Sequence, residues 1–144
     1  MTMAHLRTLT ILAALAAFAG LAQAHETGQE PAPAQSWQKD LKRADLLRSD
    51  LDNPGTEVIQ ARVDFEPGVA SPKHSHPGVE VAFVIDGTFE YQLAGRAPVT
   101  LKAGESLYIP AGTPHVAKNV GKGTASELAT YIVRKGEPLL KLEP

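Results

Sequence analysis

The sequence contains no cysteine, so a disulfide framework and thiolate chemistry are both excluded. Aromatic residues make up only 6% of the chain, and charge of one sign is not in excess, with 14 Lys and Arg against 16 Asp and Glu. A mildly acidic chain without a basic stripe is not expected to bind nucleic acid. Fold stability must therefore come from a packed core, from a bound metal or from a partner subunit.

Residues 1–24 are typical of a secretory signal peptide. Arg7 lies in a positive leader, an apolar run covers 9–21, and Ala22-Gln23-Ala24 forms a small-residue cleavage site. The apolar run is shorter than the roughly 20 residues that a membrane span needs. No cysteine follows this run, which excludes a lipid anchor, and no twin-arginine pair precedes it. We therefore expect cleavage after Ala24, a periplasmic or secreted protein, and no membrane attachment afterwards.

Two segments follow the signal peptide. Residues 25–36 contain two prolines and are expected to form a flexible linker, and residues 37–144 are expected to form one domain. The start of this domain is ambiguous, because Trp37, Leu41 and Ala44 have helical spacing whereas residues 43–50 have the pattern of an edge strand. We expect a short helical turn followed by a strand.

The remainder of the domain has the pattern of short strands separated by turns. Apolar side chains alternate in 58–65, and in 79–86 Val79, Val81, Phe83 and Ile85 lie opposite Glu80. The strands expected in the rest of the chain are 88–93, 99–101, 106–109, 115–119 and 125–133. Short strands without a long helix predict an all-β fold, a closed or nearly closed antiparallel barrel.

Three imidazoles and one carboxylate lie within residues 68–119, among β-branched and turn residues. His74, His76 and Glu80 share even parity, which would place them on one face of an extended segment, although Pro77-Gly78 interrupts it. His115 would join them from a separate strand. Three neutral nitrogens and one anionic oxygen suit a divalent transition metal, so the sequence predicts one manganese, iron, nickel, copper or zinc ion per chain.

The same region resembles the cupin superfamily. Its two motifs are Gly-x5-His-x-His-x3-Glu-x6-Gly and Gly-x5-Pro-x-Gly-x2-His-x3-Asn, and this chain fills every position with Gly68, His74, His76, Glu80, Gly87, Gly104, Pro110, Gly112, His115 and Asn119. The short gap between the motifs is similar to that of small, single-domain, quercetin dioxygenase-like cupins secreted by bacteria. The resemblance implies a double-stranded β-helix, or jelly-roll barrel, with His74, His76, Glu80 and His115 as metal ligands.

Fold alone does not decide the reaction, because cupins include enzymes, sensors and storage proteins. The leading hypothesis is a metal-dependent oxidoreductase, dioxygenase-like, that acts on a small oxygen-rich organic molecule. The alternatives are a non-catalytic module that binds or senses a small molecule, and a sugar or keto-acid isomerase. No catalytic residue beyond the metal ligands is assigned, although four polar side chains could contact a substrate: Gln60, Tyr91, Arg96 and Tyr108. An unpaired edge strand would favour a homodimer.

Overall fold

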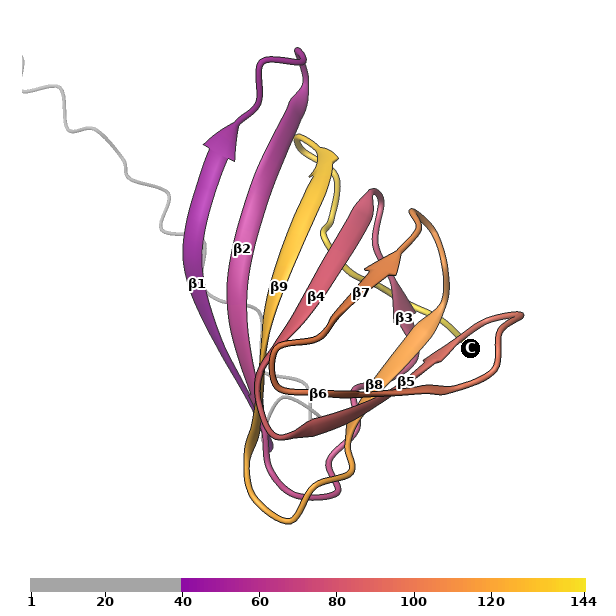
Figure 1. Cartoon of the computed structure of the whole chain (residues 1–144). Coiled ribbons are helices and arrows are strands. Elements are labelled where there is room, and N and C mark those ends of the chain that lie inside the picture. The colour runs from indigo at the N-terminus through magenta and orange to yellow at the C-terminus, as the bar shows by residue number, and fades with distance from the viewer. Residues whose placement is uncertain (1–39) are drawn as a thin grey trace, which may run out of the picture. The chain divides into compact units, whose positions relative to one another are not determined.

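The computed structural model describes residues 40–144, which form two antiparallel sheets of five strands each (Figure 1). In chain order the strands are β1 (Leu41–Asp50), β2 (Thr56–Phe65), β3 (His74–Ser75), β4 (Val79–Asp86), β5 (Thr88–Leu93), β6 (Val99–Lys102), β7 (Ser106–Ile109), β8 (His115–Asn119), β9 (Ala125–Arg134) and β10 (Lys141–Leu142). The expected signal peptide, linker and helical turn at Trp37 lie outside the described residues. Within residues 40–144, no helix is long and apolar enough to cross a membrane.

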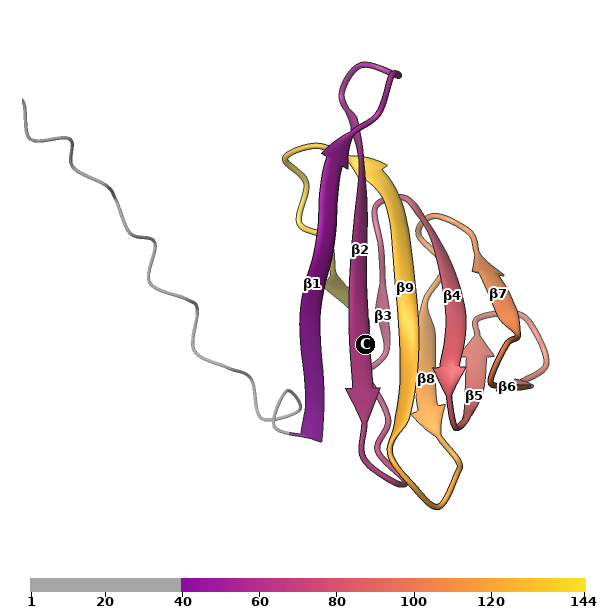
Figure 2. The same cartoon turned by 60° about the vertical axis from the view of Figure 1, so that its left-hand side comes forward.

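The strand order shows how the chain alternates between the sheets. The first sheet runs β1-β2-β9-β4-β7 and the second runs β10-β3-β8-β5-β6. The two views show these sheets facing each other (Figures 1 and 2). This arrangement confirms the predicted all-β, double-stranded β-helix. Most strand bounds also agree with the sequence patterns, whereas the two short strands β3 and β10 were not predicted.

The core lies between the two sheets. Each strand has a period of two, so every second side chain points inward and packs against the opposite sheet. Phe65 on β2 meets Phe89 on β5 edge to face, with ring centroids 5.0 Å apart. Val84, Tyr91 and Ile109 complete a group of large side chains that are almost fully buried. Because this core already joins the sheets, the inward positions at the other end of the strands are free to carry polar groups.

Strand β4 shows which face the barrel buries. Its inner face carries Glu80, Ala82 and Val84, and Glu80 is only 3% exposed. The larger apolar side chains point outward, with Phe83 38% exposed and Ile85 39% exposed. Hydropathy alone would have placed these larger side chains in the core. The buried carboxylate therefore indicates a functional interior.

Two turn residues hold the strand ends in place. Gly87, between β4 and β5, has a φ of 82°, and a Cβ added there would lie 2.6 Å from the Cβ of Ala125. Asn119 is fully buried, and its amide nitrogen donates to the carbonyl oxygens of Phe65 and Gly123 at 3.0 and 2.8 Å. Both residues therefore have a structural role in joining the strands.

Candidate metal centre

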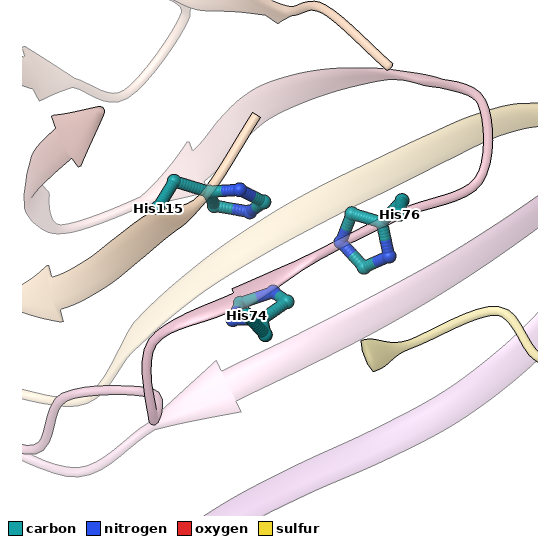
Figure 3. Close-up of side chains that lie close together, drawn as sticks. All are labelled: His74, His76 and His115. Atoms are coloured by element: carbon teal, nitrogen blue, oxygen red, sulfur yellow. The ribbon is translucent and has the colours of Figure 1, made fainter. Parts of the chain in front are cut away.

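Three histidines from separate parts of the chain meet inside the barrel (Figure 3). His74 lies on β3 and is the direct cross-strand partner of His115 on β8. His76 follows β3 in the connection to β4. All three side chains are buried, and one ring nitrogen from each lies within 4.8 Å of the other two. Strand pairing thus brings His115 to the pair of histidines that the sequence predicted to share a face.

Each imidazole is held by a backbone carbonyl on its outer side. The Nδ1 atoms of His74, His76 and His115 lie 2.8, 2.7 and 2.9 Å from the carbonyl oxygens of Pro72, Leu139 and Thr113. A carbonyl oxygen can only accept, so each Nδ1 carries the proton and donates. The Nε2 lone pairs are then free on the inner side. Such outer contacts fix the tautomer and ring orientation that a metal-binding histidine needs.

The C-terminal segment supplies one of these carbonyls. Leu139 lies 63 residues beyond His76, and its carbonyl reaches the ring just before the chain enters β10, which pairs with β3. Glu143 adds two contacts, since its amide donates to the carbonyl of Lys73 at 2.9 Å and its carboxylate accepts from the Ser75 hydroxyl at 2.7 Å. The C-terminal tail therefore lies directly behind a predicted metal ligand.

Glu80 faces two of the imidazoles. Its Oε2 lies 3.1 Å from Nε2 of His76 and 3.3 Å from Nε2 of His115. Both Oε2 of Glu80 and Nε2 of His76 are buried, and neither has a hydrogen-bond partner within residues 40–144. Two lone pairs at this separation repel each other unless a cation or a proton lies between them.

The spacing of these donors suits a shared ion. Two atoms that are each ~2.1 Å from one ion lie about 3.0 Å apart in octahedral coordination and about 3.4 Å apart in tetrahedral coordination. The observed separations of 3.1 and 3.3 Å fall between these values. Three imidazole nitrogens and one carboxylate oxygen also form a donor set that transition metals favour. The residues present therefore fit a divalent transition metal.

The pKa values in the metal-free protein reflect burial and mutual contact. Burial lowers the pKa of His74 to about 4, so this ring is neutral and ready to act as a ligand. Burial would raise the pKa of Glu80, but the imidazoles of His115 and His76 hold it at about 2. Burial would lower the pKa of His115, but the Glu80 carboxylate outweighs it and raises that pKa. A metal must therefore displace a proton from the pair formed by His115 and Glu80.

A cavity of about 310 Å³ opens beside the three histidines. Tyr131 forms part of its wall, and its ring centroid lies 4.7 Å from that of His76. The guanidinium of Arg43, on the outer strand β1, lies 5.6 Å from the centroid of the Tyr131 ring. Most of the remaining lining is apolar, including Val63 and Phe65. The cavity is large enough for a small organic molecule next to the donor atoms.

Glu127 and Tyr91 form a second polar group in the same cavity. Glu127 is 5% exposed, and its Oε2 accepts a hydrogen bond from the Tyr91 hydroxyl at 2.5 Å. Burial and the charge of Glu80 raise the pKa of Glu127 to about 8. Sequence reasoning missed Glu127, although one signal was present. Its position on β9 is inward by parity, in a row that is otherwise Ala125, Ala129, Tyr131 and Val133.

Of the four polar side chains that were considered for substrate contact, one lines the cavity and three do not. Tyr91 lines the cavity. Gln60 lies away from it, and its amide donates to the Thr130 hydroxyl at 3.1 Å. Tyr108 is 56% exposed, and Arg96 is exposed in the turn between β5 and β6. Only Tyr91 of these four could meet a molecule bound beside the histidines.

Comparison with known proteins agrees with this geometry. Residues 61–139 match the family model of the cupin domain, and the chain therefore belongs to the cupin family. The match confirms the resemblance seen in the two sequence motifs. The narrower likeness to quercetin dioxygenases and the bacterial source are not confirmed by the relatives, which include plant germin-like proteins.

Individual relatives point to the germins and oxalate oxidases. The chain is 38% identical over 86 residues to germin-like protein subfamily 2 member 2 of Arabidopsis thaliana, covering 54% of this chain and 39% of that protein. It is 34% identical over 89 residues to oxalate oxidase GF-2.8 of Triticum aestivum, covering 54% and 40%. A solved oxalate oxidase in complex with glycolate superimposes with a TM-score of 0.58 at 26% identity, covering 72% of this chain and 55% of that one. This chain thus spans about two fifths of the length of these curated relatives.

Proposed function

We propose that this protein is a metal-dependent cupin oxidoreductase, dioxygenase-like, that acts on a small oxygen-rich organic molecule. One observation carries the proposal: three imidazoles whose Nδ1 atoms face backbone carbonyls have ring nitrogens within 4.8 Å of one another beside a cavity, and Glu80 lies 3.1 and 3.3 Å from two of them. His74, His76, Glu80 and His115 would hold one divalent transition metal. Four protein ligands leave coordination positions open on a metal that prefers five or six.

Residues of this chain orient the donor atoms before any metal binds. The backbone carbonyls of Pro72, Thr113 and Leu139 orient the imidazoles, so that little reorganisation is needed when an ion and a ligand bind. Tyr131 and the apolar wall exclude bulk water from the cavity. A redox-active ion held there would supply electron exchange with a bound organic molecule or with dioxygen.

The relatives support oxidase-type chemistry, because oxalate oxidases are among the proteins that this chain resembles. The chain covers less than half of the curated sequences, so their substrate is not transferred to it. A non-catalytic module that binds a small molecule, or a sugar or keto-acid isomerase, would use the same metal site. The experiment below separates an oxidoreductase from the binding module.

The test combines metal analysis with turnover. We expect the purified protein to hold one equivalent of a transition metal and to lose it in His76→Ala. With a redox-active metal, dioxygen consumption should rise when phenols, enediols or dicarbonyl compounds are added. Metal binding without dioxygen consumption, but with a ligand-dependent rise in thermal midpoint, would favour the binding module. Failure to hold any metal would refute the proposal.

We also propose export and a homodimer. The leader at residues 1–24 supports a periplasmic or secreted protein, and amino-terminal sequencing of the exported form should begin at His25. Strand β1 is an edge strand of its sheet, and its Leu46 and Leu47 are 56% and 48% exposed. Pairing of two such edges would cover them. Light scattering should give twice the monomer mass, and Leu47→Lys should reduce it to the monomer mass.

A further inference from the structure

The cavity has a second polar end that the metal centre does not use. The Glu127 carboxylate lines the cavity together with the histidines and is almost completely buried. Within residues 40–144, the Tyr91 hydroxyl is the one group that donates a hydrogen bond to it. A carboxylate offers about four acceptor sites on its two oxygens. Glu127 therefore has unused acceptor capacity in a space that a ligand could enter.

Strand pairing places this group at a distance from the metal ligands. Glu80 on β4 pairs with Tyr131 on β9, and Glu127 lies four residues along β9 from Tyr131. Four strand residues correspond to ~13 Å along the backbone. Inward-pointing side chains reduce this distance, but the two polar ends remain separate. One molecule could contact both ends only if it carried a polar group at each.

Alanine occupies inward strand positions between the level of the metal ligands and the level of Glu127. Ala82 on β4 pairs with Ala129 on β9, which pairs in turn with Ala61 on β2. Ala117 on β8 lies directly opposite Tyr91 and itself lines the cavity. A larger side chain in this row would divide the interior. The metal ligands and Glu127 accordingly line one and the same cavity.

The chemistry of this second end selects among ligands. A neutral hydroxyl would donate to Glu127 and satisfy a buried acceptor, which is a favourable, charge-assisted contact. A ligand carboxylate at the same place would set two negative charges together in a region of low dielectric. The lining residues of the cavity offer one cationic side chain, Arg43, and it lies beside Tyr131 and pairs with Asp45.

We propose that Glu127, oriented by Tyr91, is a specificity-determining residue that binds a neutral hydroxyl and rejects a carboxylate at this end of the cavity. The substrate class is then a small molecule with an oxygen chelate at one end and a hydroxyl donor at the other. The inference rests on the proposed function, because the chelating end is placed by a metal at the three histidines. The proposed preference of Glu127 for a hydroxyl distinguishes this cavity from a site that binds a dicarboxylate.

The test uses zinc-loaded protein and three catechols that carry methyl, hydroxymethyl or carboxylate at carbon four. Zinc holds the chelating end without redox turnover, and calorimetry gives the three affinities at a pH at least one unit above the pKa of Glu127, which is about 8 without metal, so that most of this side chain is ionised. We expect the hydroxymethyl probe to bind about tenfold more tightly than the methyl probe. The carboxylate probe should bind at least about tenfold more weakly than the methyl probe. Glu127→Gln should bring the carboxylate probe within a few-fold of the methyl probe.

Two further variants complete the design. Glu57→Gln is the matched control, because Glu57 is also 5% exposed but does not line the cavity, and it should leave the order of the probes unchanged. Tyr91→Phe keeps the charge of Glu127, and it should still reject the carboxylate probe while binding the hydroxymethyl probe more weakly. It also provides an answer if Glu127→Gln does not fold.

The outcomes distinguish failure of the metal site from failure of the proposed role of Glu127. Elemental analysis before any probe is added shows whether zinc is held, and its absence would refute the metal site and this inference with it. Zinc-loaded protein that binds the three probes equally, or whose order is the same in Glu127→Gln, would refute the role of Glu127 alone. The metal site would stand in that case.

Discussion

The contact between the Leu139 carbonyl and His76 provides the sharpest test of how this site is built. The Nδ1 atom of His76 donates to that carbonyl at 2.7 Å, and the contact joins the C-terminal segment to a predicted metal ligand. We expect a chain that ends at Pro138 to bind metal roughly 10- to 100-fold more weakly, since outer contacts of metal-binding histidines have effects of this size. This corresponds to about 1.4–2.7 kcal/mol.

The truncation also removes packing, so its effect on folding must be separated from its effect on the metal. The Leu139 side chain packs against a buried cluster that contains Ile59, Tyr131 and Val133. Because Leu139 is only partly buried, Leu139→Ala should lower the free energy of unfolding by about 1–2 kcal/mol, below the range for a fully buried leucine. The backbone carbonyl remains in this variant, so its metal affinity should change by less than about threefold.

A second control isolates the short strand β10. A chain that ends at Leu140 keeps the Leu139 carbonyl but loses the pairing of β10 with β3. It should bind metal nearly as well as the full protein. Competition with a chromogenic chelator measures the affinities, and urea unfolding measures the stabilities. The reasoning would be refuted if the chain ending at Pro138 bound metal as tightly as the full protein, or if Leu139→Ala weakened binding to the same extent as that truncation.

Three more predictions concern Gly87, Glu127 and His115. Gly87→Ala should lower the free energy of unfolding by roughly 2 kcal/mol or more, because the residue has a φ of 82° and a Cβ would overlap Ala125; urea unfolding unchanged within error would contradict this. The stability of the metal-free protein should fall as pH rises toward 8, because folding raises the pKa of Glu127 from an ordinary value near 4.5 to about 8 and the folded state keeps a proton that the unfolded state has lost. Urea unfolding at several pH values should show a weaker dependence in Glu127→Gln, and an equal dependence would remove Glu127 as its cause. Apparent zinc affinity should rise with pH by up to about tenfold per unit until His115 is deprotonated, because Glu80 raises the pKa of His115 and zinc displaces that proton; a flat profile in a competition assay would refute this.

Much of the fold could be predicted because strand patterns are local. The alternation in β2, the turn at Gly87 and the bounds of β4, β5, β7 and β8 all follow from residues that are adjacent in the sequence. The strand β10 could not be predicted in this way. It has two residues, and its pairing with β3 depends on contacts between segments that are far apart in the chain.

The sequence by itself determined the fold class and predicted four side chains that could hold a metal. Parity and motif spacing placed His74, His76 and Glu80 together, and the second motif added His115, because ligands on short strands leave a local periodic signature. Only the tertiary structure decided what surrounds them. The Leu139 carbonyl lies 63 residues from the ring that it orients, and Tyr91 lies 36 residues from Glu127. A backbone carbonyl has no sequence signature, and a buried glutamate acquires its role only when folding places it in a cavity beside the Tyr91 hydroxyl.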